Sequence, residues 1–242
     1  MLEKIINFIF PLLCASCGGY LNPDAGPGIR LCGDCREKFT YIKPLFCRKC
    51  GLPLESGGEH CFSCLAQARH PQGKIYYEYL RGVCEFEGIS KDLIHSFKYR
   101  GKQYLGKTLG MMLASYMQTE DELRSADIIT PVPLHWYKKF RRGYNQSELL
   151  AKEVSSFYLK PLVTDGIYRK KHTRPQVALK RPERIRNLSG AFALKKPEQF
   201  SGKKILLIDD VSTTGETINQ CAKLLKEAGA LRVYGLAFAR DV

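Results

Sequence analysis

The chain lacks any long hydrophobic run. None of its segments approaches the roughly 18–20 consecutive apolar residues that a membrane-spanning helix needs. Its most apolar stretch, Ile5–Leu13, is interrupted by Pro11 and leads into cysteines rather than into a small-residue cleavage site. We therefore expect no membrane span and no signal peptide, and we interpret the start of the chain as a short amphipathic helix packed on the protein.

Acidic residues are also few. Only 24 of the 242 residues are Asp or Glu, against 38 Lys and Arg, so the formal net charge is +14. Hydrophobic residues at 44% and charged residues at 26% are ordinary for a globular protein and exclude wholesale disorder. The length suits one large domain or two smaller ones. The basic excess predicts a partner that carries phosphate.

Cysteine, by contrast, is concentrated in the first quarter of the chain. Eight of the ten cysteines form four Cys-x-x-Cys pairs, whereas Cys84 and Cys221 stand alone. A two-residue gap lets both thiolates of one turn point at a single ion. Four such pairs predict two zinc sites of four cysteines each rather than disulfides, and hence a reducing, cytoplasmic location. The expected ligands are Cys14, Cys17, Cys32, Cys35, Cys47, Cys50, Cys61 and Cys64.

Two pairings of these motifs fit the sequence. Sequential pairing gives Cys-x2-Cys-x14-Cys-x2-Cys followed by Cys-x2-Cys-x10-Cys-x2-Cys, whereas cross-bracing joins the first pair to the third and the second to the fourth. We favour sequential pairing because shorter loops cost less closure entropy. The module has so little apolar core that its folding should need the metal. Chelation is then expected to unfold residues 1–65 and to leave the later domain largely intact.

A polar stretch with Pro and Gly at residues 67–74 divides the chain into a zinc-binding module, residues 1–70, and a second domain, residues 71–242. In the second domain apolar strands alternate with helical patterns, which predicts an α/β fold with a parallel sheet. Expected strands lie at 75–86, 128–132, 162–167, 204–208 and 232–239, and expected helices at 90–117 (interrupted near Gly101 or Gly106), 145–157 and 217–228. In parallel sheets ligands bind beyond the carboxyl ends of strands, here the loops after Val132 and Ile208.

The loop after Ile208 carries the most specific pattern. Two carboxylates at the strand end are followed by hydroxyl side chains and a glycine that opens a helix. Hydroxyls and backbone N–H groups at a helix N-terminus bind anions, and adjacent carboxylates accept hydrogen bonds from neighbouring sugar hydroxyls. A ribose with a 5-phosphate satisfies both halves. An ordinary helix capped by Thr213 or Thr214 is the alternative, but it does not account for the paired carboxylates.

Residues 205–217 resemble the phosphoribosyl-diphosphate (PRPP) signature of type I phosphoribosyltransferases. The resemblance implies that Asp209 and Asp210 face the ribose hydroxyls while the residues that follow surround the 5-phosphate. The implied PRPP-binding set is Asp209, Asp210, Val211, Ser212, Thr213, Thr214, Gly215 and Thr217.

Two further motifs, Pro131-Val132-Pro133 and Arg142-Gly143-Tyr144-Asn145-Gln146, stand before this signature. With the cysteine pairs in front, the chain resembles the ComF competence-protein family along nearly its whole length. The resemblance implies a pyrophosphate-binding loop with His135, Lys138, Arg141, Arg142, Gly143, Asn145 and Gln146. It also implies that 169–187 form a flexible loop over the site, with Thr173, Gln176, Arg184 and Asn187.

The charge distribution agrees with a diphosphate site. Residues 138–186 hold 14 Lys and Arg against 4 Asp and Glu, a net +10 of the chain's +14. A solvated basic face is the ordinary explanation for single lysines. For Arg141, Arg142, Arg184 and Arg186 we favour phosphate contacts, because a guanidinium fork matches phosphate oxygens. His95 is expected to pack on its helix rather than to take part in catalysis.

The sequence thus predicts a parallel-sheet, type I phosphoribosyltransferase-like domain behind a small zinc-ribbon-like module. The resemblance implies binding of PRPP with magnesium and a role in DNA uptake, with phosphoribosyl transfer to an acceptor that the sequence does not name. The alternative is a non-catalytic module that senses PRPP and binds single-stranded DNA through aromatic residues in and beside the basic run Lys138–Arg142, namely Trp136, Tyr137, Phe140 and Tyr144. A scaffold for a helicase-like uptake protein is a third hypothesis. The last expected strand ends near the end of the chain, so we expect the zinc module to form the hood that recognises the acceptor.

Overall fold

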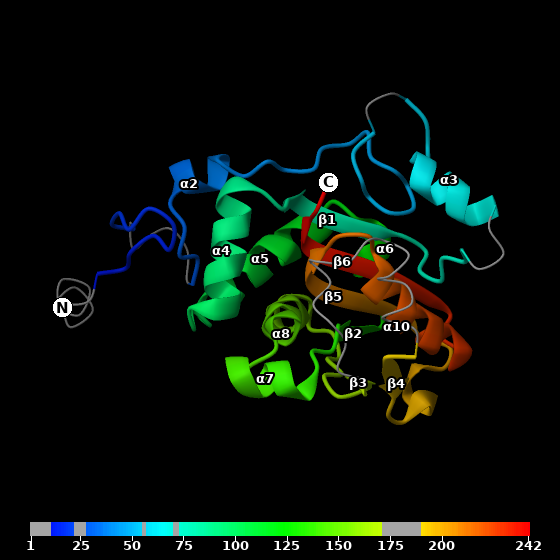
Figure 1. Cartoon of the computed structure of the whole chain (residues 1–242). Helices are drawn as coiled ribbons and strands as arrows, with labels where there is room; N and C mark the ends of the chain where they lie inside the picture. Colours follow the sequence, from blue (N-terminus) through cyan, green and yellow to red (C-terminus); the bar gives the residue numbers. More distant parts are fainter. Residues whose placement is uncertain (1–10, 22–27, 55–56, 70–72, 171–189) are drawn as a thin grey trace.

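The computed structural model describes residues 11–21, 28–54, 57–69, 73–170 and 190–242. Its centre is a sheet of four parallel strands in the order β1-β6-β5-β2 (Figure 1). The strands are β1 (Leu80–Glu85), β2 (Ile128–Pro131), β5 (Lys204–Ser212) and β6 (Arg232–Arg240). Strand β5 lies between two neighbours and is buried along most of its length, as expected for a strand covered on both faces. The parallel α/β sheet expected from the sequence is confirmed.

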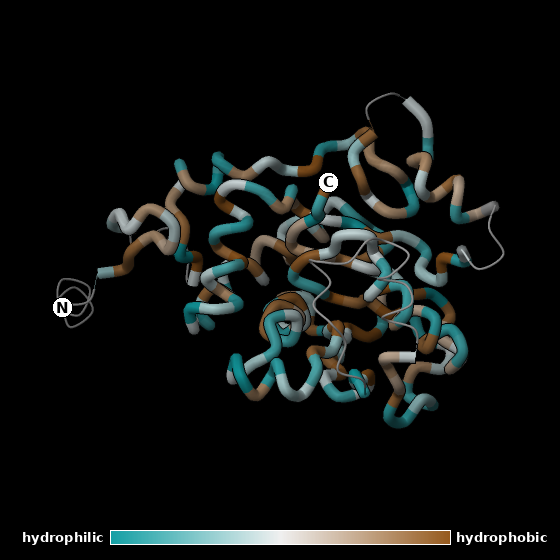
Figure 2. Tube along the Cα trace, in the orientation of Figure 1, coloured by the Kyte–Doolittle hydropathy of each residue, from teal (hydrophilic) through white to brown (hydrophobic). Residues whose placement is uncertain are grey.

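Two hydrophobic cores lie on opposite faces of this sheet. On β5, Leu206 and Ile208 join the core beneath α4 (Gly88–Tyr99), α5 (Leu105–Met117) and α8 (Gln146–Tyr158). The alternating residues Ile205 and Leu207 join the core beneath α10 (Glu216–Glu227). This period of two is the ordinary alternation of strand side chains. Figure 2 shows the hydrophobic segments gathered at the central strands.

The other elements refine the sequence expectations. The expected helix over residues 90–117 is two helices, and the break falls at Gly101, whose φ of 66° is left-handed. Around 162–167 there is one parallel bridge between Ile129 and Leu162 instead of a strand, and the next strand starts at Ile167. The expected N-terminal helix lies mainly outside the described residues. The remaining elements are α2 (Gly33–Glu37), α3 (Phe62–Arg69), α6 (Asp121–Arg124), β3 (Ile167–Arg169), β4 (Phe192–Leu194) and the 3-10 helix η2 (Pro197–Phe200), with β3 antiparallel to β4.

The basic segment after Val132 differs most from expectation. It was expected to be a loop, but Trp136–Arg142 form the helix α7. The imidazole of His135 caps its start by accepting a hydrogen bond from the Tyr137 N–H at 3.3 Å, and Gly143 ends it with a φ of 80°. Gly143 is an ordinary signal for the end of a helix, whereas histidine is not among the residues that usually mark a helix start, and the helix is too short to show hydrophobic periodicity.

The cysteine-rich module lies along the β1 edge of the sheet (Figure 1). The Glu85 N–H donates to the Thr40 carbonyl at 2.9 Å, the Ile42 N–H donates to the Val83 carbonyl at 3.1 Å, and an antiparallel bridge joins Tyr41 to Cys84. Cys14, Leu31, Cys35 and Phe39 belong to the same core as α5. The module therefore covers the sheet edge and shares the hydrophobic core of the larger domain. This shared core argues against the expectation that the larger domain stays intact when zinc is removed. The boundary at residue 70 stays a prediction.

In the part of the chain that the structure describes, no helix combines the length and the apolarity needed to cross a membrane.

Candidate phosphoribosyl site

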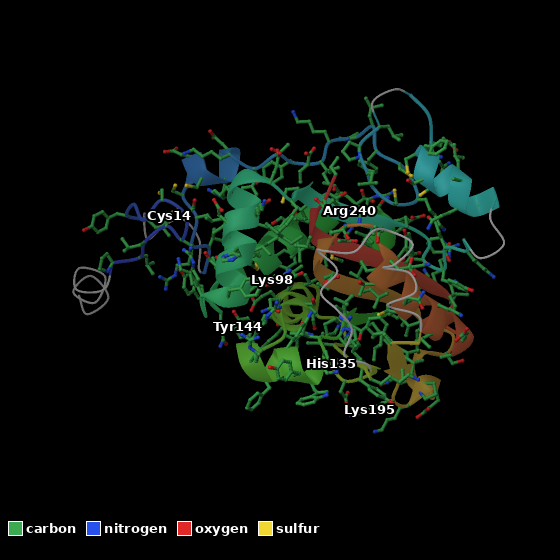
Figure 3. All side chains as sticks on the ribbon, viewed as in Figure 1. Cys14, Lys98, His135, Tyr144, Lys195 and Arg240 are labelled. Atoms are coloured by element: carbon green, nitrogen blue, oxygen red, sulfur yellow. The ribbon has the colours of Figure 1, made fainter. Side chains whose placement is uncertain are left out.

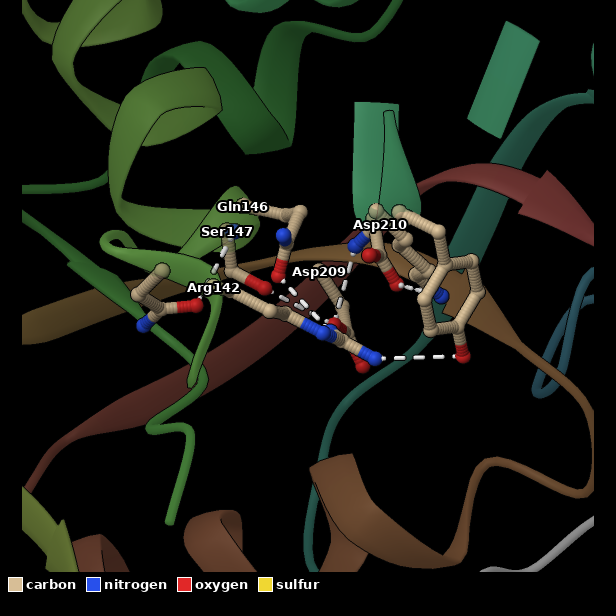
Figure 4. A network of polar contacts seen from close by, with 8 residues as sticks. Arg142, Gln146, Ser147, Asp209 and Asp210 are labelled. Carbon is tan, nitrogen blue, oxygen red and sulfur yellow. Dashed lines mark hydrogen bonds and ion pairs between the residues drawn. The ribbon is translucent and has the colours of Figure 1, made fainter. Parts of the chain in front are cut away.

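The two carboxylates at the end of β5 lie in a polar network (Figure 4). The Ser147 hydroxyl and the Asp210 N–H each donate to Asp209 Oδ1 at 2.9 Å. Lys98 Nζ pairs with Asp210 Oδ1, also at 2.9 Å. Burial, reinforced by the charge of Asp210, raises the pKa of Asp209 to about 7, while Lys98 opposes the shift. Burial therefore makes the charged form of Asp209 costly in the free protein.

The phosphate loop, residues 211–217, connects β5 to α10. Gly215 is the N-cap of α10 with a φ of 77°, and a Cβ there would lie 3.1 Å from the Tyr77 hydroxyl and from Leu80 Cδ2. The position therefore requires glycine. Gly215, rather than Thr213 or Thr214, occupies the N-cap, so the alternative that places a threonine at the N-cap is wrong, although the Thr214 hydroxyl accepts a hydrogen bond from the Glu216 N–H at 3.4 Å. The loop places hydroxyl side chains at the positive end of a twelve-residue helix, which suits an anion.

These groups form the floor of a cleft of about 640 Å³. One wall, here called the basic wall, comes from α7 and the start of α8 and consists of Lys138, Arg142, Asn145, Gln146 and Ser147. The other wall comes from α4 and consists of Ile94, His95, Lys98 and Tyr99. The cleft brings together all the expected PRPP-binding residues, Asp209, Asp210, Val211, Ser212, Thr213, Thr214, Gly215 and Thr217.

Arg142 bridges the two walls. Its guanidinium donates to Gln146 Oε1 at 3.0 Å and to the Tyr99 hydroxyl at 3.2 Å, and it lies 4.9 Å from the centre of the Tyr99 ring. Lys138, beside it, has its pKa lowered by burial and by the charges of Arg169, Arg142 and Lys98. Positive charge is therefore concentrated around Lys138 and Arg142, and an anionic ligand bound there would reduce the repulsion between these cations.

Other residues expected in the pyrophosphate loop lie elsewhere. His135 and Gly143 do not line the cleft but fix the ends of α7, and Arg141 is exposed. Tyr144, which was grouped with the DNA-stacking aromatics, is buried against Phe97 and donates to its carbonyl. The flexible-loop residues Thr173, Gln176, Arg184 and Asn187 lie outside the described residues.

The sequence does not predict several residues that line the cleft: Lys98, Tyr99 and Ser147, together with His95, which is expected only to pack on its helix. Arg169, the first residue of the expected flexible loop, also lines the cleft. Ser147 follows the Asn145-Gln146 motif directly, and this position was the signal that could have found it. Nothing in the periodicity of α4 distinguishes Lys98 from a solvated lysine. The zinc module is expected to form the hood over the site, but no described residue before Phe86 lines the cleft, and α4 forms the wall there.

The eight paired cysteines form two clusters. Cys14, Cys17, Cys32 and Cys35 are together in one, and Cys47, Cys50, Cys61 and Cys64 in the other. Within each cluster all four sulfur atoms lie within 4.8 Å of one another. Sequential pairing is thus confirmed, and the cross-braced alternative is wrong. All of these cysteines are free thiols.

The sulfur geometry fits zinc. A tetrahedral site with Zn–S bonds of about 2.3 Å has sulfur atoms about 3.8 Å apart. Cys17 Sγ lies 3.8 Å from Cys32 Sγ, and Cys50 Sγ lies 3.6 Å from Cys61 Sγ. In the first cluster the Gly19 N–H donates to Cys17 Sγ at 3.4 Å, which supports the thiolate form. Each cluster therefore offers the four soft ligands and the spacing that a zinc ribbon needs.

We expect freshly reduced protein to contain two zinc ions per chain by elemental analysis, because the two clusters have equivalent geometry. One equivalent or fewer would contradict the presence of two sites. Cys84 and Cys221, which lie outside both clusters, provide the matched control: replacing either with alanine should leave the zinc content at two.

Comparison with known proteins finds two family models that match different parts of the chain. The model of the double zinc ribbon domain matches residues 5–65, and that of the phosphoribosyl transferase domain matches residues 141–239. Competence protein F of Haemophilus influenzae is 32% identical, over 97% of this chain and 100% of its own length. The chain belongs to the competence protein F (ComF) family.

A second relative is the DNA utilization protein YhgH of Escherichia coli K12, which is 31% identical over 84% of this chain and 87% of its own. Among solved structures, the allosteric regulatory enzyme of purine biosynthesis covers 55% of this chain and 25% of its own, with 22% identity and a TM-score of 0.38. As a ComF-family member, the chain combines a double zinc ribbon with the phosphoribosyltransferase-type domain described above.

Proposed function

We propose that this protein binds PRPP with Mg²⁺ in the cleft at the end of β5 and transfers its phosphoribosyl group to an acceptor with release of pyrophosphate. The observation that carries the proposal is the juxtaposition of three groups in one cleft. Asp209 and Asp210 lie at its floor, the hydroxyl-rich phosphate loop continues from them, and the basic wall with Lys138 and Arg142 faces them. PRPP carries the matching three groups: vicinal hydroxyls, a 5-phosphate and a diphosphate.

The chemistry follows from where charge develops. As the bond between ribose C1 and the diphosphate breaks, positive charge grows on the sugar and negative charge on the leaving group. The buried carboxylates stabilise the first, and the basic wall stabilises the second. A bound Mg²⁺, for which the carboxylate oxygens of Asp209 and Asp210 are suitable ligands, would neutralise part of the diphosphate charge.

The direct test incubates the full-length protein with PRPP, Mg²⁺ and a panel of acceptors and measures pyrophosphate release. Release that depends on one acceptor supports transfer. Saturable PRPP binding without pyrophosphate release in the presence of any acceptor would contradict phosphoribosyl transfer and would instead support a non-catalytic PRPP sensor.

A second function, binding of single-stranded DNA, has an observation of its own. Trp136 and Phe140 on α7 have exposed fractions of 69% and 83% and lie one helical turn apart among Lys138, Lys139 and Arg141. Exposed aromatics between cations suit stacked bases and a phosphate backbone. The names of the relatives, a competence protein and a DNA utilization protein, agree with a DNA ligand.

We expect Trp136→Ala/Phe140→Ala to weaken binding of single-stranded DNA at least tenfold, because each stacked base contributes about 1–3 kcal/mol. The dependence of affinity on salt should not change, since no cation is removed. Phe62→Ala, at an 86% exposed phenylalanine on α3, is the matched control and should have no effect. If the double variant and Phe62→Ala lost DNA affinity equally, or if neither lost any, α7 would not be the DNA-binding surface.

A further inference from the structure

Arg240, the last residue of β6, is a buried arginine at the start of the phosphate loop (Figure 3). Its side chain is fully buried, and its Nη1 donates to the Ser212 carbonyl at 3.1 Å and to the Ser212 hydroxyl at 2.6 Å. Ser212 is where β5 ends and the chain turns into the loop. One guanidinium nitrogen therefore holds both the backbone and the side chain of this residue.

The path of the Arg240 side chain is fixed by a glycine on the neighbouring strand. A Cβ at Gly82 of β1 would lie 2.1 Å from Arg240 Cγ and 3.1 Å from its Cδ. Beyond this point a second cavity of about 280 Å³ is lined by Arg240 together with Thr213 and Thr214 of the phosphate loop and Cys50 and Cys64 of the second cysteine cluster. The arginine thus lies between the loop and the second zinc ribbon.

The second ribbon, which contains Cys47, Cys50, Cys61 and Cys64, is hydrogen-bonded to β1, the strand that contains Gly82. The Leu80 N–H donates to the Lys49 carbonyl at 2.9 Å, and Arg81 Nη1 donates to the Arg48 carbonyl at 3.0 Å. A Cβ at Gly51 would lie 2.4 Å from the Leu80 carbonyl oxygen, so the ribbon backbone approaches β1 as closely as glycine allows. The position of this cysteine cluster relative to Arg240 is therefore determined by backbone contacts.

Among the described residues no acidic side chain forms an ion pair with the buried guanidinium of Arg240, although Asp241 lines the same cavity. The Arg240 Nε is buried without a hydrogen bond. Burial lowers the pKa of the guanidinium, and the neighbouring Cys50, Tyr77 and Cys64 oppose this. A buried cation needs a counter-charge, and one Zn²⁺ with four thiolates carries a net charge of −2.

We propose that Arg240 is a positioning residue for the phosphate loop, and that the second four-cysteine centre, when it holds zinc, supplies the negative charge that keeps Arg240 against Ser212. The inference rests on the proposed function for its effect on PRPP, but not for its effect on the loop. Occupancy of the second zinc site, and not of the first, then determines whether the phosphate site is formed.

The test compares two single variants of the full-length chain that each remove one of the more accessible ligands of a cluster, Cys61→Ala and Cys17→Ala. Zinc content, hydrogen exchange at residues 212–217 without ligand, and affinity for Mg²⁺–PRPP are measured for both. Cys61→Ala should speed exchange in the loop at least tenfold and weaken PRPP binding at least tenfold. Cys17→Ala should change the exchange rate in the loop and the affinity for PRPP less than threefold each. Equal effects of the two variants, or none from Cys61→Ala, would overturn the proposal.

A second set of variants leaves the cysteines in place, so that misfolding of the ribbon does not decide the result. Arg240→Gln and Gly82→Ala, which places a methyl group against the arginine stem, should both speed exchange in the loop at least tenfold. Arg232→Gln, at the exposed arginine that begins the same strand β6, is the control and should leave loop exchange unchanged. Unchanged exchange in Arg240→Gln would overturn the proposal, whereas absence of PRPP binding in the wild type would overturn only the proposed function.

Discussion

Replacing Asp209 and Asp210 together with asparagine should lower the affinity for Mg²⁺–PRPP at least a hundredfold. In the proposed complex both carboxylates accept hydrogen bonds from ribose hydroxyls in a buried site, and a hydrogen bond to a charged group contributes about 1.5–3 kcal/mol. Two such bonds account for a loss of this size. Titration calorimetry of the wild type and the double variant measures the difference.

The same double variant should bind single-stranded DNA as tightly as the wild type or slightly more tightly, because it removes two negative charges from a basic cleft. Asp92→Asn/Asp165→Asn, which makes the same change in net charge at two exposed positions, is the matched control and should keep wild-type affinity for PRPP. Normal PRPP binding by the Asp209/Asp210 variant would show that the end of β5 is not the ribose site.

The single change Asp209→Asn should stabilise the free protein, and more so at pH 8 than at pH 5.5. The folded-state pKa of Asp209, about 7, lies above that of an unfolded aspartate. Between these values the folded chain keeps a proton that the unfolded chain has lost, so wild-type stability falls as the pH rises toward 7. Asparagine has no proton to lose, and its amide oxygen still accepts from Ser147.

The free energy of unfolding gained by Asp209→Asn should therefore increase by about 2 kcal/mol between pH 5.5 and pH 8, which corresponds to roughly 4–8 °C in Tm for a chain of this size. Thermal melts at the two pH values measure it, and Asp92→Asn, an exposed carboxylate on α4, should show no such increase. A gain independent of pH would mean that Asp209 is already ionised at pH 5.5. A stabilised but inactive variant is the behaviour expected of a residue retained for function at a cost in stability.

The features that the sequence predicted correctly are those encoded within short segments. The apolar run from Ile205 to Ile208, followed at once by Asp209, predicts both a buried strand and the polar end of the site. The cysteine spacing likewise predicts two clusters, because a turn of fixed length brings each pair of thiols together.

The features that it missed depend on contacts between distant segments. Lys98 reaches Asp210 from a helix more than a hundred residues earlier, and nothing in the pattern of that helix distinguishes its lysines. Arg240 was overlooked for the same reason, since its role depends on Gly82 and on the second ribbon, which the chain brings beside it only in the folded state. The sequence predicts a loop where α7 lies, because the seven residues of this helix are too few to show a hydrophobic period.

Calorimetric titration of the wild type with PRPP, in the presence and absence of Mg²⁺, is the most direct test of the proposal that the cleft between α4 and α7 binds PRPP. We expect one PRPP molecule to bind per chain, more tightly with Mg²⁺ than without. Ribose 5-phosphate should bind much more weakly, because it lacks the diphosphate that we propose Lys138 and Arg142 contact. No saturable heat with Mg²⁺–PRPP, from protein that contains its full zinc complement, would contradict the proposal.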